Sequence, residues 1–484
     1  MSTAADTDWL GRRAALSPRK VGLVEVATGL HLDYAAWNQS AARVAAGLAS
    51  LGVTRGDRVA ILAENSVEVL DTVFACAKLG GLAVMLGTRL TPAELAPMLV
   101  RAAPAVLAFG PGLEATAHAL VGARARPLAS LVGPEPWRGV PAAQREDPWQ
   151  VVYTGGSTGT PKGAVLTHAG LLANAAGTAA AWGLGEDDVT ILDAPLHHTG
   201  GLNVLTTPLV WLGGTSHLAA RFDEDVSFDL LAAGAPTVLF GVPTVLARLT
   251  QHERWADADL GRLRLVITGG APAPAALFER WRERGRTLRL GYGLSEAGPN
   301  NFWLPEAMAR ARPGAVGLPL PHVETRLEDG ELLLRGPHLM AGYLDDAAAT
   351  AATIDAAGWL HTGDLARRGD DGVFTIVGRR KEMFISGGEN VYPAEVEDAL
   401  CAHPRVAEAA VLGVPHERWG ETGLAAVAVR AGSELEAAEL RGFLAGRLAR
   451  FKLPSRVVFV PSLPRTGAGK VDRRALRSLL GASE

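Results

Sequence analysis

The segment VVYTGGSTGTPKG, residues 151–163, is the densest run of glycine and hydroxyl side chains in the chain. Glycines allow successive backbone N–H groups to converge, and such concavities bind anions. The hydroxyl and lysine side chains of the run add further donors and one positive charge. The residues that would supply these groups are Thr154, Gly155, Gly156, Ser157, Thr158, Gly159, Thr160 and Lys162. The segment therefore predicts a loop that holds a polyphosphate.

Three other interpretations of this loop can be compared with its residues, of which the first is excluded and two stay open. The Walker pattern is absent, because Pro161 precedes Lys162 and Gly163 follows it. Residues 155–159 do satisfy G-x-S-x-G, the nucleophile elbow of serine hydrolases, which requires a helix directly after the serine turn. The residues after the loop, KGAVL, predict a strand instead. A plain flexible connection between strands is the third alternative.

Composition restricts the class of protein. The chain has 484 residues, 48% of them hydrophobic and 20% charged, with a formal net charge of −4. These values are ordinary for a globular protein and give no electrostatic reason to expect nucleic acid as a partner. The two cysteines, Cys76 and Cys401, cannot form a disulfide framework or a zinc site. The sequence has neither a signal peptide nor an apolar run of membrane-spanning length, so we expect a cytoplasmic protein without integral membrane association, a monomer or homodimer.

Short apolar runs alternate with helical patterns along most of the chain, which predicts an α/β fold with parallel strands. Residues 57–62 are typical of a strand and residues 67–80 of a helix that stops at a glycine. Strands followed by glycine recur at PTVLFGVP, LRLVITGG and TLRLGYG, while residues 111–148 are irregular and proline-rich. The pattern changes near Gly378. We therefore predict a large layered α/β domain over residues 1–380 and a small α+β cap over 381–484.

Further motifs follow the glycine-rich loop in a fixed order. They are PLHHTGG (195–201), ITGGAP (267–272), GYGLSE (291–296), HTGD (361–364), GRRKEMFISGGENVYPAEVE (378–397) and PRTGAGK (464–470). Together with the loop, this set resembles the adenylate-forming superfamily, which includes acyl- and aryl-CoA ligases, luciferases and peptide-synthetase adenylation domains. The resemblance covers essentially the whole chain. It departs from the family pattern at Gly155, where a hydroxyl residue is usual.

The resemblance implies an ATP- or AMP-binding site. Besides the loop residues, it assigns this role to Gly270, Ala271, Pro272, Gly291, Tyr292, Gly293, Ser295, Asp364 and Arg379. Tyr292 would stack on adenine, Asp364 would accept both ribose hydroxyls, and Arg379 would support the same ribose. Glu296 and Thr154 would help hold Mg²⁺, which prefers carboxylate and other oxygen ligands.

The resemblance also implies the catalytic groups. Lys470 would bridge the attacking carboxylate and the α-phosphate of ATP, and His198 would lie beside the acyl site. Because Lys470 belongs to the cap, it can serve the large domain only when the cap closes.

Members of the family rotate the cap about a hinge two residues after the ribose arginine, which here is Lys381. A proline at Lys381 is accordingly expected to preserve adenylation and block thioester formation. In the second orientation the opposite face of the cap would bind CoA. The residues implied for CoA are Gly387, Gly388, Trp419, Phe451 and Lys452.

The sequence thus predicts an AMP-forming acid–CoA ligase with Mg²⁺ as cofactor and ATP and CoA as co-substrates. The candidate acyl-pocket segments, residues 195–211, 238–247 and 291–304, carry only one charged residue, Glu296. A second carboxylate on the substrate would need a buried counter-charge, although Arg221, Arg248 or Arg282 could reach in. We therefore expect an apolar-tailed monocarboxylate, a fatty acid first and an aryl or arylpropenoic acid second. Loading of a carrier protein and, with less support, serine hydrolase activity remain alternatives.

Overall fold

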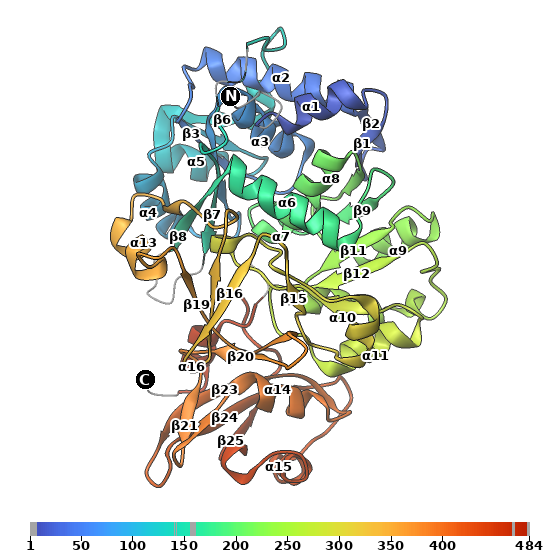
Figure 1. The fold of residues 1–484 in the computed structure, drawn as a ribbon, viewed down its shortest axis with the longest axis vertical. Helices are drawn as coiled ribbons and strands as arrows, with labels where there is room; N and C mark the ends of the chain where they lie inside the picture. Colours follow the sequence, from blue (N-terminus) through green and yellow to red (C-terminus); the bar gives the residue numbers. More distant parts are fainter. Residues whose placement is uncertain (1–6, 140, 142, 155–160, 467–469, 482–484) are drawn as a thin grey trace.

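The computed structural model describes residues 7–139, 141, 143–154, 161–466 and 470–481. Figure 1 shows a broad upper body built from the N-terminal three quarters of the chain and a smaller lower body, orange to red, built from the C-terminal residues. We call residues 7–380 the large domain and residues 381–481 the cap. The mixed α/β architecture with a large N-terminal and a small C-terminal part confirms the predicted fold class.

A seven-stranded sheet forms the centre of the large domain. Its order is β18 (Gly342–Tyr343), β8 (Lys162–Thr167), β7 (Pro148–Thr154), β4 (Leu82–Leu86), β3 (Arg58–Leu62), β5 (Val106–Phe109) and β6 (Ala125–Pro127). From β7 to β6 neighbouring strands are parallel, whereas β8 is antiparallel to β7 and to β18. The parallel part agrees with the alternation of strands and helices in the sequence.

The other sheets of the large domain are smaller. One has the order β2 (Leu30–Asp33), β1 (Val21–Glu25), β10 (Thr215–Leu218), β9 (Val189–Leu192), and a parallel one has β11 (Val238–Gly241), β12 (Leu265–Thr268), β13 (Leu288–Leu290). Strands β14 (Phe302–Trp303) and β15 (Leu318–Pro319) form a pair. An antiparallel sheet of β16 (Glu324–Glu328), β17 (Glu331–Arg335), β19 (Leu360–Arg368) and β20 (Phe374–Arg379) leads to the cap.

The helices of the large domain cover these sheets (Figure 1). They are α1 (Trp9–Leu16), α2 (Tyr34–Ser50), α3 (Val67–Leu79), α4 (Pro92–Ala102), α5 (Glu114–Val121), α6 (His168–Trp182), α7 (Thr199–Gly201), α8 (Thr207–Leu212), α9 (Glu224–Ala232), α10 (Pro243–Gln251), α11 (Ala275–Glu283), α12 (Glu306–Ala311) and α13 (Ala347–Thr353). Helix α5 and strand β6 lie in the segment 111–148 that the sequence suggested was irregular, so that expectation was wrong in part.

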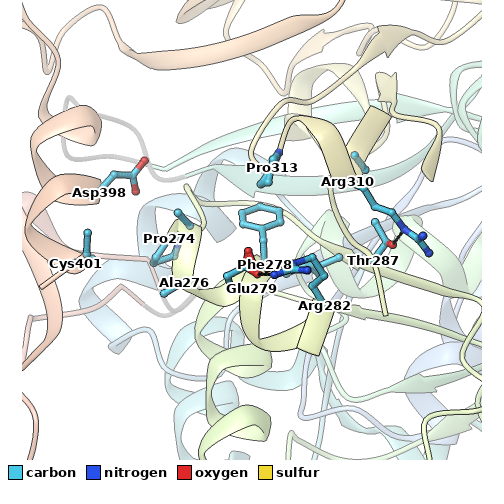
Figure 2. A pocket seen from close by; sticks show the side chains of 14 residues that line it. Pro274, Ala276, Phe278, Glu279, Arg282, Thr287, Arg310, Pro313, Asp398 and Cys401 are labelled. Carbon is cyan, nitrogen blue, oxygen red and sulfur yellow. Dashed lines mark hydrogen bonds and ion pairs between the residues drawn. The ribbon is translucent and has the colours of Figure 1, made fainter. Parts of the chain in front are cut away.

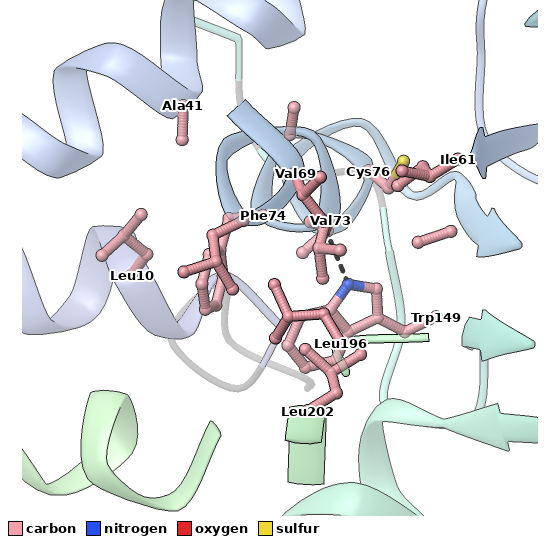
Figure 3. Close-up of a cluster of buried hydrophobic side chains, with 14 of the residues drawn as sticks. Leu10, Ala41, Ile61, Val69, Val73, Phe74, Cys76, Trp149, Leu196 and Leu202 are labelled. Atoms are coloured by element: carbon pink, nitrogen blue, oxygen red, sulfur yellow. Dashed lines mark hydrogen bonds between the residues drawn. The ribbon is translucent and has the colours of Figure 1, made fainter. Parts of the chain in front are cut away.

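Helix α3 shows how the sequence sets an element's ends. The hydroxyl of Ser66 accepts a hydrogen bond from the Val69 N–H, and Gly80 ends the helix with φ 72°. The predicted helix with a glycine stop is thus confirmed. Figure 3 shows the buried cluster that α3 helps form: Phe74 packs near Trp149, whose indole N–H donates to the Val73 carbonyl at 3.0 Å.

The cap has its own sheet and helices. Strands β22 (Glu389–Val391), β21 (Phe384–Ser386), β24 (Gly420–Val429) and β23 (Val406–His416) lie side by side, and β25 (Arg456–Phe459) pairs with β24. Helices α14 (Pro393–Cys401), α15 (Ala437–Ala445) and α16 (Arg473–Leu479) pack on it. Among the described residues, each hydrophobic cluster draws its members from one side of residue 380 only. The boundary at 380/381 itself stays a prediction.

The helices are too short or too polar for a membrane span, as far as the described residues go.

Candidate active site

The glycine-rich segment joins two antiparallel strands. Thr154, the last residue of β7, pairs with Lys162, the first of β8. Residues 155–160 lie outside the described residues, so the predicted contacts of Gly155, Gly156, Ser157, Thr158 and Gly159 stay predictions. Because β8 is a strand, the serine turn does not lead into a helix, and the nucleophile-elbow alternative is wrong.

Glu296 lies in a short helical turn, Ser295–Ala297, opposite the start of β8. The hydroxyl of Tyr343 donates to Glu296 Oε1 at 2.7 Å, and the ammonium of Lys162 lies 5.2 Å from the centre of the Tyr343 ring. Burial, followed by the charge of Glu296, raises the pKa of Tyr343 above its ordinary value, so its hydroxyl keeps its proton. Tyr343 therefore positions the Glu296 carboxylate, a role that the sequence did not reveal.

The residues at this place fit a magnesium ion that is shared with phosphate. In the described part of the chain, no group of three or more His, Cys, Asp or Glu side chains converges as a protein metal site would. Glu296 offers a carboxylate with one oxygen bound to Tyr343, and Thr154 offers a hydroxyl at the end of β7. Mg²⁺ is commonly held by one or two carboxylates together with substrate phosphates and water. Glu296 and Thr154 would hold it here.

The predicted nucleotide residues gather at the carboxyl ends of parallel strands. Gly270, Ala271 and Pro272 follow β12, and Gly291 follows β13 with its N–H donating to the Thr268 carbonyl at 2.7 Å. Tyr292, Gly293 and Ser295 continue from the same strand. In α/β folds this edge is where ligands bind.

Tyr292, Asp364 and Arg379 form a hydrogen-bonded row. The Tyr292 hydroxyl donates to Asp364 Oδ2 at 2.6 Å, and Arg379 Nε lies 2.7 Å from Asp364 Oδ1. Burial raises the pKa of Asp364, while the Arg379 charge opposes that rise. The Tyr292 ring packs edge-on against Phe302 in a core cluster. Tyr292 thus has a structural role in the core; its stacking on adenine stays a prediction.

His198 caps the short helix α7 at its N-terminus. Its Nε2 is buried and has no hydrogen-bond partner among the described residues, and its ring centre is 4.3 Å from that of His197. Burial, followed by the charges of His197 and Lys470, lowers the pKa of His198 to about 3. The imidazole is therefore neutral. Beside it, Gly200 approaches Phe240, whose ring would lie 3.4 Å from a Cβ at that position.

Lys470 of the cap reaches this region of the large domain. Solvent reaches its side chain. Desolvation and then the Arg379 charge lower its pKa, whereas the carboxylates of Asp364 and Glu296 oppose the change. These charge interactions extend from the cap to the nucleotide residues and to His198, so Lys470 faces the large domain in this structure; its adenylation role stays a prediction.

The predicted CoA residues all lie on the cap. The Gly387 N–H donates to the Trp419 carbonyl at 2.8 Å, and a Cβ on Gly387 would be 3.0 Å from the Trp419 ring. Gly387 and Gly388 have φ of 63° and 88°, so the turn itself favours glycine at both positions; their role beside a pantetheine arm stays a prediction. Lys452 Nζ bonds Glu395 at 2.6 Å and lies 5.7 Å from the centre of the adjacent Phe451 ring.

A cavity of about 350 Å³ lies between the large domain and the cap. Figure 2 shows Phe278 and Arg282 of α11 on one side and Asp398 and Cys401 of α14 on the other. None of the predicted site residues lines it. The cavity shows that α14 meets the large domain through α11 in this cap orientation, away from the nucleotide residues.

Two of the arginines that could have offered a counter-charge are engaged elsewhere. Arg248 pairs with Glu224 at 2.5 Å and stacks on Phe222, and Arg282 pairs with Glu279 at 2.5 Å. Sequence reasoning also missed Arg289 of β13, which lies 4.5 Å from the centre of the Trp303 ring.

Comparison with known proteins identifies the family. The family model described as AMP-binding enzyme matches residues 10–344, and the one described as AMP-binding enzyme C-terminal domain matches residues 395–470. The feruloyl-CoA synthase of an Amycolatopsis species is 38% identical over 486 residues, the indoleacetate–CoA ligase of Aromatoleum aromaticum 36% over 501, and the 2-succinylbenzoate–CoA ligase of Bacillus cereus 32% over 491. Each alignment covers 98% of this chain and 98% of the relative.

Solved structures add information on the conformation. ATP-bound MatB from Rhodopseudomonas palustris matches with a TM-score of 0.92 at 33% identity, covering 99% of both chains. Its apo form, at the same identity and coverage, has a TM-score of only 0.80. Because the sequence similarity is equal, the difference reflects conformation, and the present arrangement is closer to the ATP-bound form. The chain belongs to the AMP-binding enzymes of the adenylate-forming superfamily, and its relatives are CoA ligases.

Proposed function

We propose that this protein is an AMP-forming acid–CoA ligase that activates an aryl acid of the arylpropenoate or arylacetate type. The observation that carries the proposal is the convergence of Lys470 from the cap with Asp364, Glu296 and His198 of the large domain. A nucleotide-binding module without catalysis would have no need of a cap lysine at this place.

In the first half-reaction a carboxylate oxygen of the acid attacks the α-phosphorus of ATP. The bond from that phosphorus to the bridging oxygen breaks, and pyrophosphate leaves with the electron pair. Lys470 would hold the two anions together, since a cation at the developing charge lowers the barrier. Asp364 and Arg379 would fix the ribose, and Glu296 would hold Mg²⁺, which supplies positive charge to the phosphates when bound.

In the second half-reaction the CoA sulfur attacks the carbonyl carbon of the acyl adenylate. The thiol gives up its proton, and AMP leaves with the electron pair of the broken carbonyl–oxygen bond. The cap would first turn about Lys381 and bring the face with Trp419 toward the site. Lys452 would then exchange Glu395 for a CoA phosphate, because both are oxyanions that a lysine binds.

The substrate class rests on the pocket and on the relatives. The neutral His198, Phe240 beside Gly200, and the outward pairs of Arg248 and Arg282 favour an acid whose tail is uncharged. The feruloyl and indoleacetate relatives are named for monocarboxylic aryl acids. The relatives do not support the expectation that fatty acids rank first. The 2-succinylbenzoate relative makes a dicarboxylate the alternative to test.

The experiment is acid-dependent ATP–pyrophosphate exchange over a panel of ferulate, indoleacetate, 2-succinylbenzoate and a medium-chain fatty acid. We expect kcat/KM for one of the aryl monocarboxylates to exceed that for 2-succinylbenzoate by about 10-fold or more, which is the cost of an unpaired buried charge. Chromatography should show AMP and the CoA thioester as products. ADP as the nucleotide product would refute the ligase chemistry, and 2-succinylbenzoate as the best acid would refute the pocket argument.

A further inference from the structure

Five residues, Arg379–Met383, connect the large domain to the cap. The N–H groups of Glu382 and Met383 both donate to the Arg379 carbonyl, at 3.0 and 3.1 Å, so the connection is a tight turn. Lys381 in its middle is exposed, and within the described residues it has no hydrogen bond or ion pair. The side chains of its two neighbours are both held, that of Arg380 by the large domain and that of Glu382 by the cap.

Arg380 is held by the large domain. Its guanidinium lies 2.8 Å from Glu331 Oε2, and its N–H donates to the Gly363 carbonyl at 2.8 Å. Glu331, on β17, is a buried carboxylate with a side chain only 8% exposed, and its other oxygen accepts the Gly363 N–H at 2.9 Å. A buried, fixed carboxylate restrains the arginine that it pairs with. An ion pair between two flexible side chains on the surface restrains either partner less.

Glu382 is held by the cap. Its carboxylate lies 3.1 Å from Nε of Arg473, the first residue of α16. Arg473 also bonds Glu397 of α14 at 2.8 Å and the Val411 carbonyl of β23 at 2.8 Å. Glu382 is therefore tied to a residue of α16 that is itself bonded to two further elements of the cap.

We propose that the Arg380–Glu331 and Glu382–Arg473 ion pairs are positioning contacts that confine the rotation of the cap to Lys381. With the Arg380 side chain held on one side and the Glu382 side chain on the other, Lys381 is the residue between them at which a change of dihedral angles would break neither ion pair. Hinges of this kind absorb a large change over few residues. The consequence is that Lys470 returns to one place in every cycle. This inference rests on the proposed function, because only a two-step ligase needs the cap to turn.

The test uses Glu331→Gln, Arg380→Met and the double variant. The Gln keeps an acceptor for the Gly363 N–H but loses the charge, and the Met keeps the apolar stem of the arginine. Arg367→Met, another exposed arginine on the same sheet, is the matched control. We expect the adenylation rate constant to fall on the order of 10-fold with KM for ATP unchanged, because misplacement of Lys470 by a fraction of an ångström is costly. The double variant should lose no more than either single variant.

A second readout reports the cap orientation directly. Spin labels at Asp187→Cys and Glu434→Cys, both exposed, in a Cys401→Ser background, give a distribution of interdomain distances with AMP bound. We expect this distribution to broaden in Glu331→Gln and in Glu382→Gln but not in Arg367→Met. Glu382→Gln acts from the cap side and keeps the test valid should Glu331→Gln fail to fold.

An unchanged distance distribution in both glutamine variants, or losses that add in the double variant, would overturn the inference. Failure of the proposed function looks different. In that case the parental protein shows no acid-dependent exchange, while the distance distributions still report whether the ion pairs confine the cap.

Discussion

Asp364 and Arg379 face each other across strands β19 and β20, with Arg379 Nε 2.7 Å from Asp364 Oδ1. The strands are directly paired at these residues, so the sheet itself fixes the ion pair. The remaining Asp364 oxygen accepts the Tyr292 hydroxyl. A carboxylate held on both oxygens is oriented before any nucleotide arrives, which reduces the entropy lost on binding.

Replacing Asp364 by asparagine should weaken nucleotide binding. We expect kcat/KM for ATP to fall by about 10- to 100-fold, since hydrogen bonds to a charged group contribute about 1.5–3 kcal/mol. The measurement is steady-state kinetics with ATP varied. Asp371→Asn, an exposed aspartate on the turn between the same strands that pairs with Arg312, serves as control and should leave the constant unchanged.

Replacing Lys470 by alanine should separate the two half-reactions. The adenylation rate should fall by roughly 10²–10³, the cost of removing one group that stabilises developing charge. Thioester formation from a supplied acyl adenylate should change far less, because the cap has then turned. Stopped-flow measurement of each step checks this, with Lys20→Ala as a surface control. Equal losses in both steps would mean that Lys470 is structural.

A proline at Lys381 should act in the direction opposite to the one that the sequence suggested. The turn places the Glu382 and Met383 N–H groups on the Arg379 carbonyl, which requires helix-like dihedral angles at Arg380. A proline disfavours such angles in the residue before it. We therefore expect Lys381→Pro to lose ATP–pyrophosphate exchange more than thioester formation from acyl adenylate, while Lys381→Ala keeps both. If Lys381→Pro kept ATP–pyrophosphate exchange at the parental rate and lost thioester formation, the expectation from the sequence would hold instead.

His198 should not set the pH dependence of adenylation. Its pKa of about 3 keeps the imidazole neutral at every pH above roughly 4, so it takes up a proton only well below the working range. We expect His198→Asn to lower kcat/KM for the acid by about 10-fold and to leave the shape of the pH profile between 5.5 and 8 unchanged. If the pH profile of the parental protein had a transition with a midpoint near 6.5, and if this transition disappeared in His198→Asn, then His198 would titrate during catalysis.

The sequence predicted those helices and strands whose ends are marked by residues next to them in the chain. Helix α3 has a serine before it and a glycine after it, and strands β11, β12 and β13 each end near glycine, so their limits could be recognised. Helix α5 lacks a side-chain cap, and the prolines near it concealed it.

The contacts that the sequence could not predict join distant segments. Tyr343 lies 47 residues from Glu296, and Arg380 lies 49 from Glu331. Glu296 and Arg380 lie in recognisable motifs, but nothing in the chain indicates that Tyr343 and Glu331 are their partners, so only the packing of the sheets reveals the pairs. Several residues of the family motifs, by contrast, do lie together, because those motifs follow the ends of neighbouring strands; their roles stay predictions.

The absence of any hydrophobic cluster that crosses residue 380, within the part of the chain that is described, has an evolutionary consequence. Substitutions that reshape the acid pocket alter packing in the large domain alone, and the cap need not compensate for them. With the acid pocket in the large domain and the thiol-binding face on the cap, as proposed above, the choice of acid would diverge without change in the face that binds the thiol. The two bodies meet around Lys381, where α14 faces α11, and at Lys470, and among the described residues none of these contacts belongs to a shared hydrophobic cluster.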